Sequence, residues 1–222
     1  MTLTLSAQDL FRTAYENRYT WDTAFPGYRA DLTLSQGDEV YQGQVQVNPD
    51  FTVTVTGIEV EAVRDSVLHQ LRDVVTHRKR NEFEQVHGKN QFSFGDRGPD
   101  ESQAILVTGD AMGSHYRVRG QEICQVSRVM GPMAFTIDTE KTLSTGQGYI
   151  AVEYQAIFRD AQSGELKAQR QFQESYTNIE GYYLPEKQVI VANRVAAAKP
   201  PAPDGQQTTT IFQFSHFQLL TP

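Results

Sequence analysis

Apolar and polar side chains alternate along three consecutive segments that begin at Tyr28. In each segment every second residue is apolar, which places those residues on one face of a β-strand. The segments cover residues 28–34, 41–47 and 51–56, and turns rich in Gly, Asn, Pro and Asp separate them. Short turns between alternating segments predict an antiparallel meander with one buried face and one wet face.

Two segments have helical spacing instead. Ser6 followed three residues later by Asp9 is typical of a helix N-cap, and we expect a short helix that ends near Asn17. After Gly57, apolar residues recur at helical spacing and predict a second helix that ends at residues 78–80, where cations complement the helix dipole. The apolar stripe of this second helix comprises Val60, Val63, Val67, Leu71 and Val74, and Leu68 and Val75 widen it.

The remaining chain is read mainly as further strands. We expect them at residues 83–94, 103–108, 115–119, 122–130, 134–141, 149–159, 166–175, 184–193 and 208–220. Residues 196–206 are rich in proline and predict a long loop inside the domain. Phe212 and Phe214 fall on one face of the last strand and Phe217 on the other, which predicts a bulge near Ser215-His216.

Aromatic residues concentrate in a short stretch that joins the first helix to the first strand. Its members are Phe11, Tyr15, Tyr19, Trp21, Phe25 and Tyr28. Two interpretations stand side by side: these side chains plug one end of the core, or they line the mouth of a ligand cavity. In the second interpretation the ligand-binding residues are Tyr15, Tyr19, Trp21, Phe25, Tyr28 and Leu71.

Two resemblances follow from these residues. Tyr15-Glu-Asn-Arg-Tyr-Thr-Trp-Asp22 with Phe25-Pro-Gly-Tyr28 is similar to a family of uncharacterised proteins of cyanobacteria and plant plastids. The order of short helix, three-strand meander and covering helix resembles the start of lipoprotein carriers of the LolA/LolB type. That resemblance implies a curved sheet whose mouth holds helices and whose cavity holds acyl chains.

We therefore predict one α+β domain over residues 1–222. Its centre is a large curved antiparallel sheet of about ten strands, half-barrel or barrel-like, with two helices, LolA-like or lipocalin-like. Curled antiparallel sheets often hold a small apolar ligand. If the barrel is open, its edge strands favour a homodimer.

The composition and charge of the chain limit the partners and sites that we expect. A net charge of −7 argues against broad binding to nucleic acid or anionic membranes. No apolar run approaches the ~20 residues of a transmembrane helix. The start of the chain has no signal-peptide pattern, so we expect a cytoplasmic or plastid-stroma-like location and not export of the LolA kind. The single cysteine, Cys124, excludes an intrachain disulfide and a four-cysteine zinc site.

Five groups of residues suggest chemistry, and each has a simpler interpretation. Metal binding by His69, Asp73 and His77 competes with a solvated helix face. An anion-binding or nuclear-import patch at residues 77–80 competes with helix capping. For Asp96–Glu101, calcium binding competes with a polar turn. A nucleophile at residues 113–115 lacks the Gly-x-Ser-x-Gly pattern and competes with a hairpin turn. A reactive Cys124 competes with a buried inert thiol.

Three function classes remain open. The favoured one is non-catalytic binding or carrying of an apolar small molecule, such as a lipid, a pigment or an isoprenoid. The alternative is a protein-interaction or assembly factor that uses the sheet edge or the aromatic mouth. An enzyme comes third, because no nucleophile–base pair, phosphate loop or metal cluster is legible and no cofactor is indicated.

Overall fold

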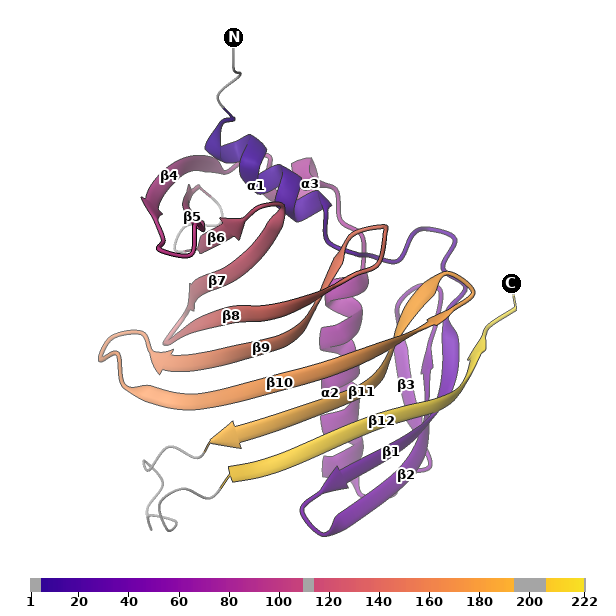
Figure 1. Ribbon diagram of the computed structural model, residues 1–222. Helices are drawn as coiled ribbons and strands as arrows, with labels where there is room; N and C mark the ends of the chain where they lie inside the picture. The colour runs from indigo at the N-terminus through magenta and orange to yellow at the C-terminus, as the bar shows by residue number, and fades with distance from the viewer. Residues whose placement is uncertain (1–4, 110–113, 194–206, 222) are drawn as a thin grey trace. The chain divides into compact units, whose positions relative to one another are not determined.

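A twelve-stranded antiparallel sheet and three helices make up the described chain (Figure 1). The computed structural model describes residues 5–109, 114–193 and 207–221. The helices are α1 (Ala7–Glu16), α2 (Glu61–Arg78) and α3 (Phe83–His87). The strands are β1 (Tyr28–Gln36), β2 (Glu39–Val47), β3 (Val53–Thr56), β4 (Gln91–Arg97), β5 (Gln103–Thr108), β6 (His115–Arg119), β7 (Glu122–Met130), β8 (Met133–Ser144), β9 (Tyr149–Asp160), β10 (Leu166–Ile179), β11 (Tyr182–Asn193) and β12 (Gln207–Leu219). The predicted loop at residues 196–206 lies outside the described residues.

The strand order confirms the predicted α+β class with its large antiparallel sheet. The order is β3-β2-β1-β12-β11-β10-β9-β8-β7-β6-β5-β4, so β3 and β4 form the two ends and the sheet is open. Twelve strands replace the predicted number of about ten, and a third helix is present. None of the helices in the described part of the chain combines the length and the apolar character that crossing a membrane needs.

The third helix corrects one strand prediction. Residues 83–94 were expected to form a single strand, but Phe83–His87 is helical and β4 begins only at Gln91. Phe83 and His87 stand four residues apart, so a helix turns both side chains to the same side, where both are buried. Burial of both side chains therefore favours a helix here over the strand that the alternating pattern predicts.

The chain forms two compact units, each built from segments that are distant in sequence. Unit 1 comprises Met1–Tyr19, Asn81–Gln171 and Ala192–Gln207, and unit 2 comprises Thr20–Arg80, Phe172–Val191 and Thr208–Pro222, as far as these ranges are described. The prediction of a single domain over residues 1–222 stays a prediction.

Unit 1 is organised around α1. Ser6 and Asp9 cap the helix reciprocally, as the sequence predicts. Phe11, Ala14 and Tyr15 on its buried side pack into a cluster with Phe83 and Tyr116. The helix contacts α3 and strands β4, β6 and β7, and Figure 1 shows α1 and α3 together above these strands. We call the sheet face that α1 covers the inner face of unit 1.

Unit 2 contains the predicted meander and α2. The meander β1–β2–β3 is confirmed, and β1 also pairs with β12. An extra residue on β12 shifts the register between Arg29 and Asp31, and His216 has φ 53°, so the predicted bulge is confirmed.

The buried face of α2 is turned slightly from the predicted stripe. Val60 precedes the helix and is 49% exposed. The residues that the helix buries are Val67, Leu71, Val75 and Arg78.

Candidate ligand-binding site

The two units divide the aromatic stretch of the sequence. Tyr15 and Tyr19 belong to unit 1, whereas Trp21, Phe25 and Tyr28 belong to unit 2 together with Leu71. All six predicted site residues are buried, with at most 8% of their surface exposed. The stretch is therefore divided between the two compact units, and the ligand-binding role of the six residues stays a prediction.

The unit 2 cluster is a stack of aromatic rings. The ring centroids of Trp21 and Phe25 are 4.2 Å apart at an interplanar angle of 13°, and Phe51 lies parallel to both. The Trp21 Nε1–H donates to the carbonyl oxygen of Tyr183 at 3.2 Å. The Trp21 backbone N–H donates to the Arg78 carbonyl at 2.8 Å. This geometry ties the chain before β1 to the end of α2.

A polar network lies beside this stack. Arg78 Nη2 donates to the Tyr176 hydroxyl at 3.0 Å, and that hydroxyl donates to Glu174 at 2.5 Å. Gln188 Nε2 donates to the other Glu174 oxygen at 2.5 Å. Burial raises the pKa of the hydroxyls of Tyr176 and Tyr28. Both phenols therefore stay protonated, and the hydrogen bonds of the network join the end of α2 to β10 and β11.

The inner face of unit 1 has an open apolar part beyond the packed core. Val126 on β7 packs against the core cluster, and cross-strand pairing continues its row through Ile137 on β8 to Ala156 on β9. The next row runs from Arg128 through Phe135 to Phe158. Ile137, Phe135 and Phe158 are only half-buried. The opposite face of β7 and β8 carries polar pairs instead, Ser127 with Thr136 and Gln125 with Asp138.

Arginines lie beside this apolar surface. Arg128 Nη2 donates to the Tyr116 hydroxyl at 2.7 Å, and the Arg128 Nε is buried without a hydrogen-bond partner. The guanidinium of Arg170 lies 5.7 Å from the ring centroid of Phe158. Arg18 lies 3.9 Å from the ring centroid of Tyr15. A guanidinium over an aromatic face is stabilised by the ring quadrupole.

His87 lies within the same aromatic cluster. Its ring lies edge-on to the rings of Tyr15 and Phe11, with distances between ring centroids of 4.9 and 5.1 Å respectively. Asn90 Nδ2 lies 3.2 Å from His87 Nδ1, and since an amide nitrogen only donates, this ring nitrogen accepts. Burial, with the charges of Arg128 and Arg18, lowers the pKa of His87 to about 4. The imidazole is therefore neutral at pH 7.

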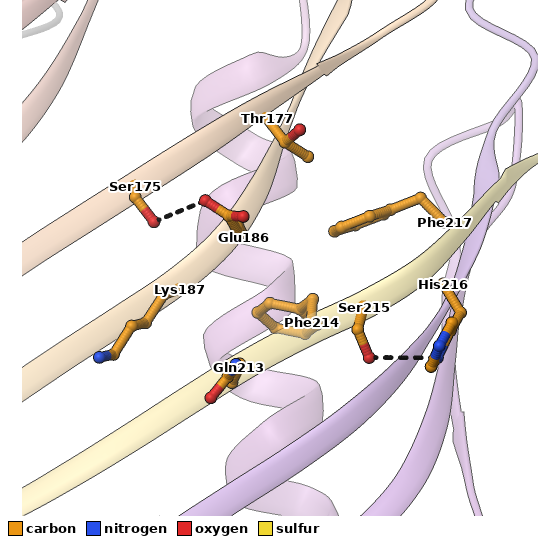
Figure 2. A pocket seen from close by; sticks show the side chains of 9 residues that line it. All are labelled: Ser175, Thr177, Glu186, Lys187, Gln213, Phe214, Ser215, His216 and Phe217. Atoms are coloured by element: carbon orange, nitrogen blue, oxygen red, sulfur yellow. Dashed lines mark hydrogen bonds between the residues drawn. The ribbon is translucent and has the colours of Figure 1, made fainter.

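Unit 2 has a groove on the sheet, shown in Figure 2. Its volume is about 430 Å³. The lining residues are Ser175, Thr177, Glu186, Lys187, Gln213, Phe214, Ser215, His216 and Phe217. Most of these side chains are polar or charged, which suits an apolar ligand less well than the inner face of unit 1.

Two lining residues of the groove, Ser215 and His216, lie near Asp31 on β1, but the three side chains do not have the geometry of a catalytic triad. Ser215 Oγ lies 3.4 Å and Asp31 Oδ2 lies 3.0 Å from His216, but both contact the same ring nitrogen, Nδ1. A triad needs the carboxylate on one ring nitrogen and the hydroxyl on the other. The His216 side chain is also 81% exposed.

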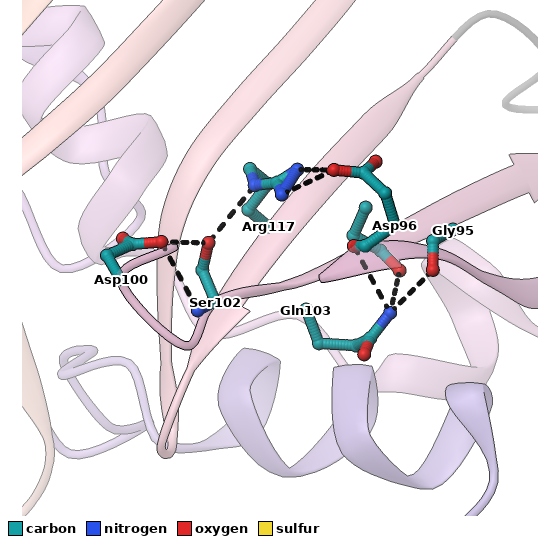
Figure 3. A network of polar contacts seen from close by, with 7 residues as sticks. Gly95, Asp96, Asp100, Ser102, Gln103 and Arg117 are labelled. Carbon is teal, nitrogen blue, oxygen red and sulfur yellow. Dashed lines mark hydrogen bonds and ion pairs between the residues drawn. The ribbon is translucent and has the colours of Figure 1, made fainter. Parts of the chain in front are cut away.

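The acidic loop at residues 96–101 is organised by arginine (Figure 3). Arg117 donates to Asp96 through both Nη atoms at 3.0 and 2.8 Å, and Arg119 donates to Asp100 at 3.2 Å. Asp100 also accepts from the backbone N–H and the hydroxyl of Ser102. These contacts neutralise two of the carboxylates that the calcium hypothesis needs, so the loop is a charge-paired turn.

The other candidates from the sequence lie as follows. For the metal hypothesis, His69 Nε2 and Asp73 Oδ2 lie 3.9 Å apart on the exposed side of α2. For the anion-binding hypothesis, the Arg78 side chain is buried and does not contribute to a surface patch. Ser114 precedes β6, with no helix after it. Burial raises the pKa of the Cys124 thiol, which disfavours the reactive thiolate. In the described part of the chain, no group of three His, Cys, Asp or Glu side chains could hold a metal ion.

Sequence reasoning missed Arg128, Arg170 and the apolar row between them. A signal was present: Arg128 stands two residues after Val126, at a position that alternation assigns to the apolar face of the strand. A cation on the apolar face of a strand needs either a hydrogen-bonding partner or access to solvent. Which side chains it meets depends on the pairing of β7 with β8, which local alternation does not specify.

Comparison with known proteins gives one family and a distant structural similarity. No curated protein sequence matches the chain. The structure is similar to the crystal structure of a LolA superfamily protein from Nitrosomonas europaea, with 12% sequence identity over 99% of this chain and 96% of that chain. The TM-score of 0.33 is too low to support an argument about fold or function. The model of the DUF3386 family, described as a protein of unknown function, matches residues 2–220. Because this match spans nearly the whole sequence, the chain belongs to the DUF3386 family.

Proposed function

We propose that this protein binds and carries an apolar small molecule, such as a lipid, a pigment or an isoprenoid, without catalysis. The proposal is carried by the partly buried apolar surface on the inner face of unit 1. Phe135, Ile137 and Phe158 continue a packed core onto strands where their side chains stay partly open to solvent. When a ligand covers apolar area that is exposed beside a folded core, the free energy of the complex falls, because that area is removed from water.

The test compares one substitution on opposite faces of neighbouring strands. Ile137→Gln places an amide on the inner face, whereas Ile157→Gln makes the same change on the outer face of β9. The probe is the methyl ester of cis-parinaric acid, an uncharged fluorescent C18 chain. We expect Ile137→Gln to weaken its binding about tenfold, because the ligand would bury an unpaired amide. Ile157→Gln should leave the affinity within about twofold of the unchanged protein.

Native mass spectrometry of gently purified protein supplies a second measurement. We expect a bound apolar molecule in the unchanged protein and less of it in the Ile137→Gln variant. The proposal is contradicted if the ester does not bind the unchanged protein, or if the two variants weaken binding equally.

A second candidate function is association with another protein, favoured by the hairpin between β7 and β8. Val129, Met130 and Met133 at its tip are 55%, 62% and 39% exposed. Exposed apolar clusters of this kind often mark contact surfaces. If the tip joins two copies of the chain, sedimentation velocity should show a dimer that Met130→Lys dissociates. A monomer at every concentration of the unchanged protein would exclude the homodimer.

A further inference from the structure

We infer that the ligand of the inner face is an anionic amphiphile, whose oxyanion head is bound by Arg128 while its chain covers Phe135, Ile137 and Phe158, with the positive charge of Arg170 on the far side of the two rings. The inference rests on the proposed function and adds the chemical class of the ligand. The shared chemistry is an oxyanion, carboxylate or phosphate, attached to an apolar chain.

The first argument is the order of side chains along one row of the sheet. Arg128 pairs across strands with Phe135, which pairs with Phe158. The centroids of the two phenylalanine rings are 6.3 Å apart, and the guanidinium of Arg170 lies over the second ring. An apolar pair thus has a cation on each side, and an amphiphile that carries an anion complements this arrangement.

The second argument is the state of the Arg128 guanidinium. Its Nη2 is fixed by the hydroxyl of Tyr116, a residue that is only 4% exposed. Its Nε is buried and has no hydrogen-bond partner, which costs free energy in the unliganded protein. A carboxylate or phosphate accepts hydrogen bonds from guanidinium in a bidentate manner and would satisfy the free N–H.

The third argument is charge balance. Arg12, Arg117 and Arg119 in unit 1 pair with Glu84, Asp96 and Asp100 respectively. Among the described residues, no carboxylate lies within 4 Å of the guanidinium of Arg128 or Arg170. In a chain of net charge −7 these two cations lack the carboxylate partners that Arg12, Arg117 and Arg119 have. An external anion is the complementary group.

The experiment titrates the full chain with cis-parinarate, with its uncharged methyl ester and with inorganic phosphate. We expect parinarate to bind about tenfold more tightly than the ester, the ratio that one charge-assisted hydrogen bond supplies. Arg128→Gln should remove this preference, and an unchanged circular dichroism spectrum would show that the variant is folded. Arg170→Gln should reduce the preference, and Arg128→Lys should keep part of it.

Arg159→Gln is the matched control, since it removes one positive charge from the outer face of β9, where Arg159 donates to the Gly164 carbonyl. It should leave the parinarate preference intact. Equal affinity of the unchanged protein for parinarate and ester would overturn the inference while the proposed function survives. Failure of both to bind would overturn the proposed function itself. Displacement of parinarate by inorganic phosphate at equal concentration would show a site for free anions and overturn the amphiphile.

Discussion

Trp21→Ala should destabilise the protein by about 3–5 kcal/mol, the usual cost of removing a large buried aromatic side chain. Trp21 is 1% exposed and stacks on Phe25, with Phe51 parallel to both. The substitution would leave a cavity in this stack and would also leave the Tyr183 carbonyl without its indole donor. Denaturant unfolding measures the loss. It is followed by circular dichroism and not by tryptophan fluorescence, because the substitution removes the only tryptophan of the chain.

Two variants control this experiment. Trp21→Phe keeps most of the ring stack and should cost less than the alanine variant. Val60→Ala removes an apolar side chain that is 49% exposed and should change stability by less than about 0.5 kcal/mol. A loss below about 1 kcal/mol for Trp21→Ala, with weakened ligand binding, would support the interpretation of Trp21 as part of a ligand mouth.

The second large effect is a loss of stability as the pH falls from about 6.5 to about 4. In the unfolded chain a histidine has a pKa near 6.5, whereas in the folded protein burial and the neighbouring arginines lower the pKa of His87 to about 4. Between these values only the unfolded state binds the proton, so protonation favours unfolding. The contribution of neutral His87 to the free energy of unfolding is fully present above pH 6.5, and about 3 kcal/mol of it is lost by pH 4.

The measurement is the free energy of unfolding of wild type and His87→Gln at several pH values in this window. Glutamine does not titrate, so the variant should lose less stability on acidification than wild type. His69→Gln is the control, because His69 lies on α2 with 81% of its side chain exposed. An equal pH dependence in wild type and His87→Gln would show that His87 is not the buried neutral group described above.

The comparison of sequence with structure separates local from long-range information. The cap of α1, the three strands of the meander and the bulge of β12 follow from neighbouring residues, and all were predicted. At residues 83–87 the local pattern misled, because the side chains of Phe83 and His87 gain more from joining the α1 cluster than from alternating along a strand.

The candidate site was much harder to predict than the fold. Alternation places Phe135 and Ile137 on one face of a strand, but it does not tell whether that face is filled or open. The contact of Arg128 with Tyr116 joins two strands, and the contact of Arg170 with Phe158 joins two others. Each contact depends on strand register, which is set by turns and bulges elsewhere in the sheet.

The sequence by itself determined the α+β class, the large antiparallel sheet and the absence of a disulfide within the chain, because alternation, caps and cysteine count are properties of the chain alone. Only the tertiary structure decided that the aromatic stretch from Phe11 to Tyr28 is divided between two compact units. It also decided that Arg128 lies beside an open apolar row. The reason is that burial and charge pairing depend on which residues meet across distant strands, and those partners are chosen by the folded sheet as a whole.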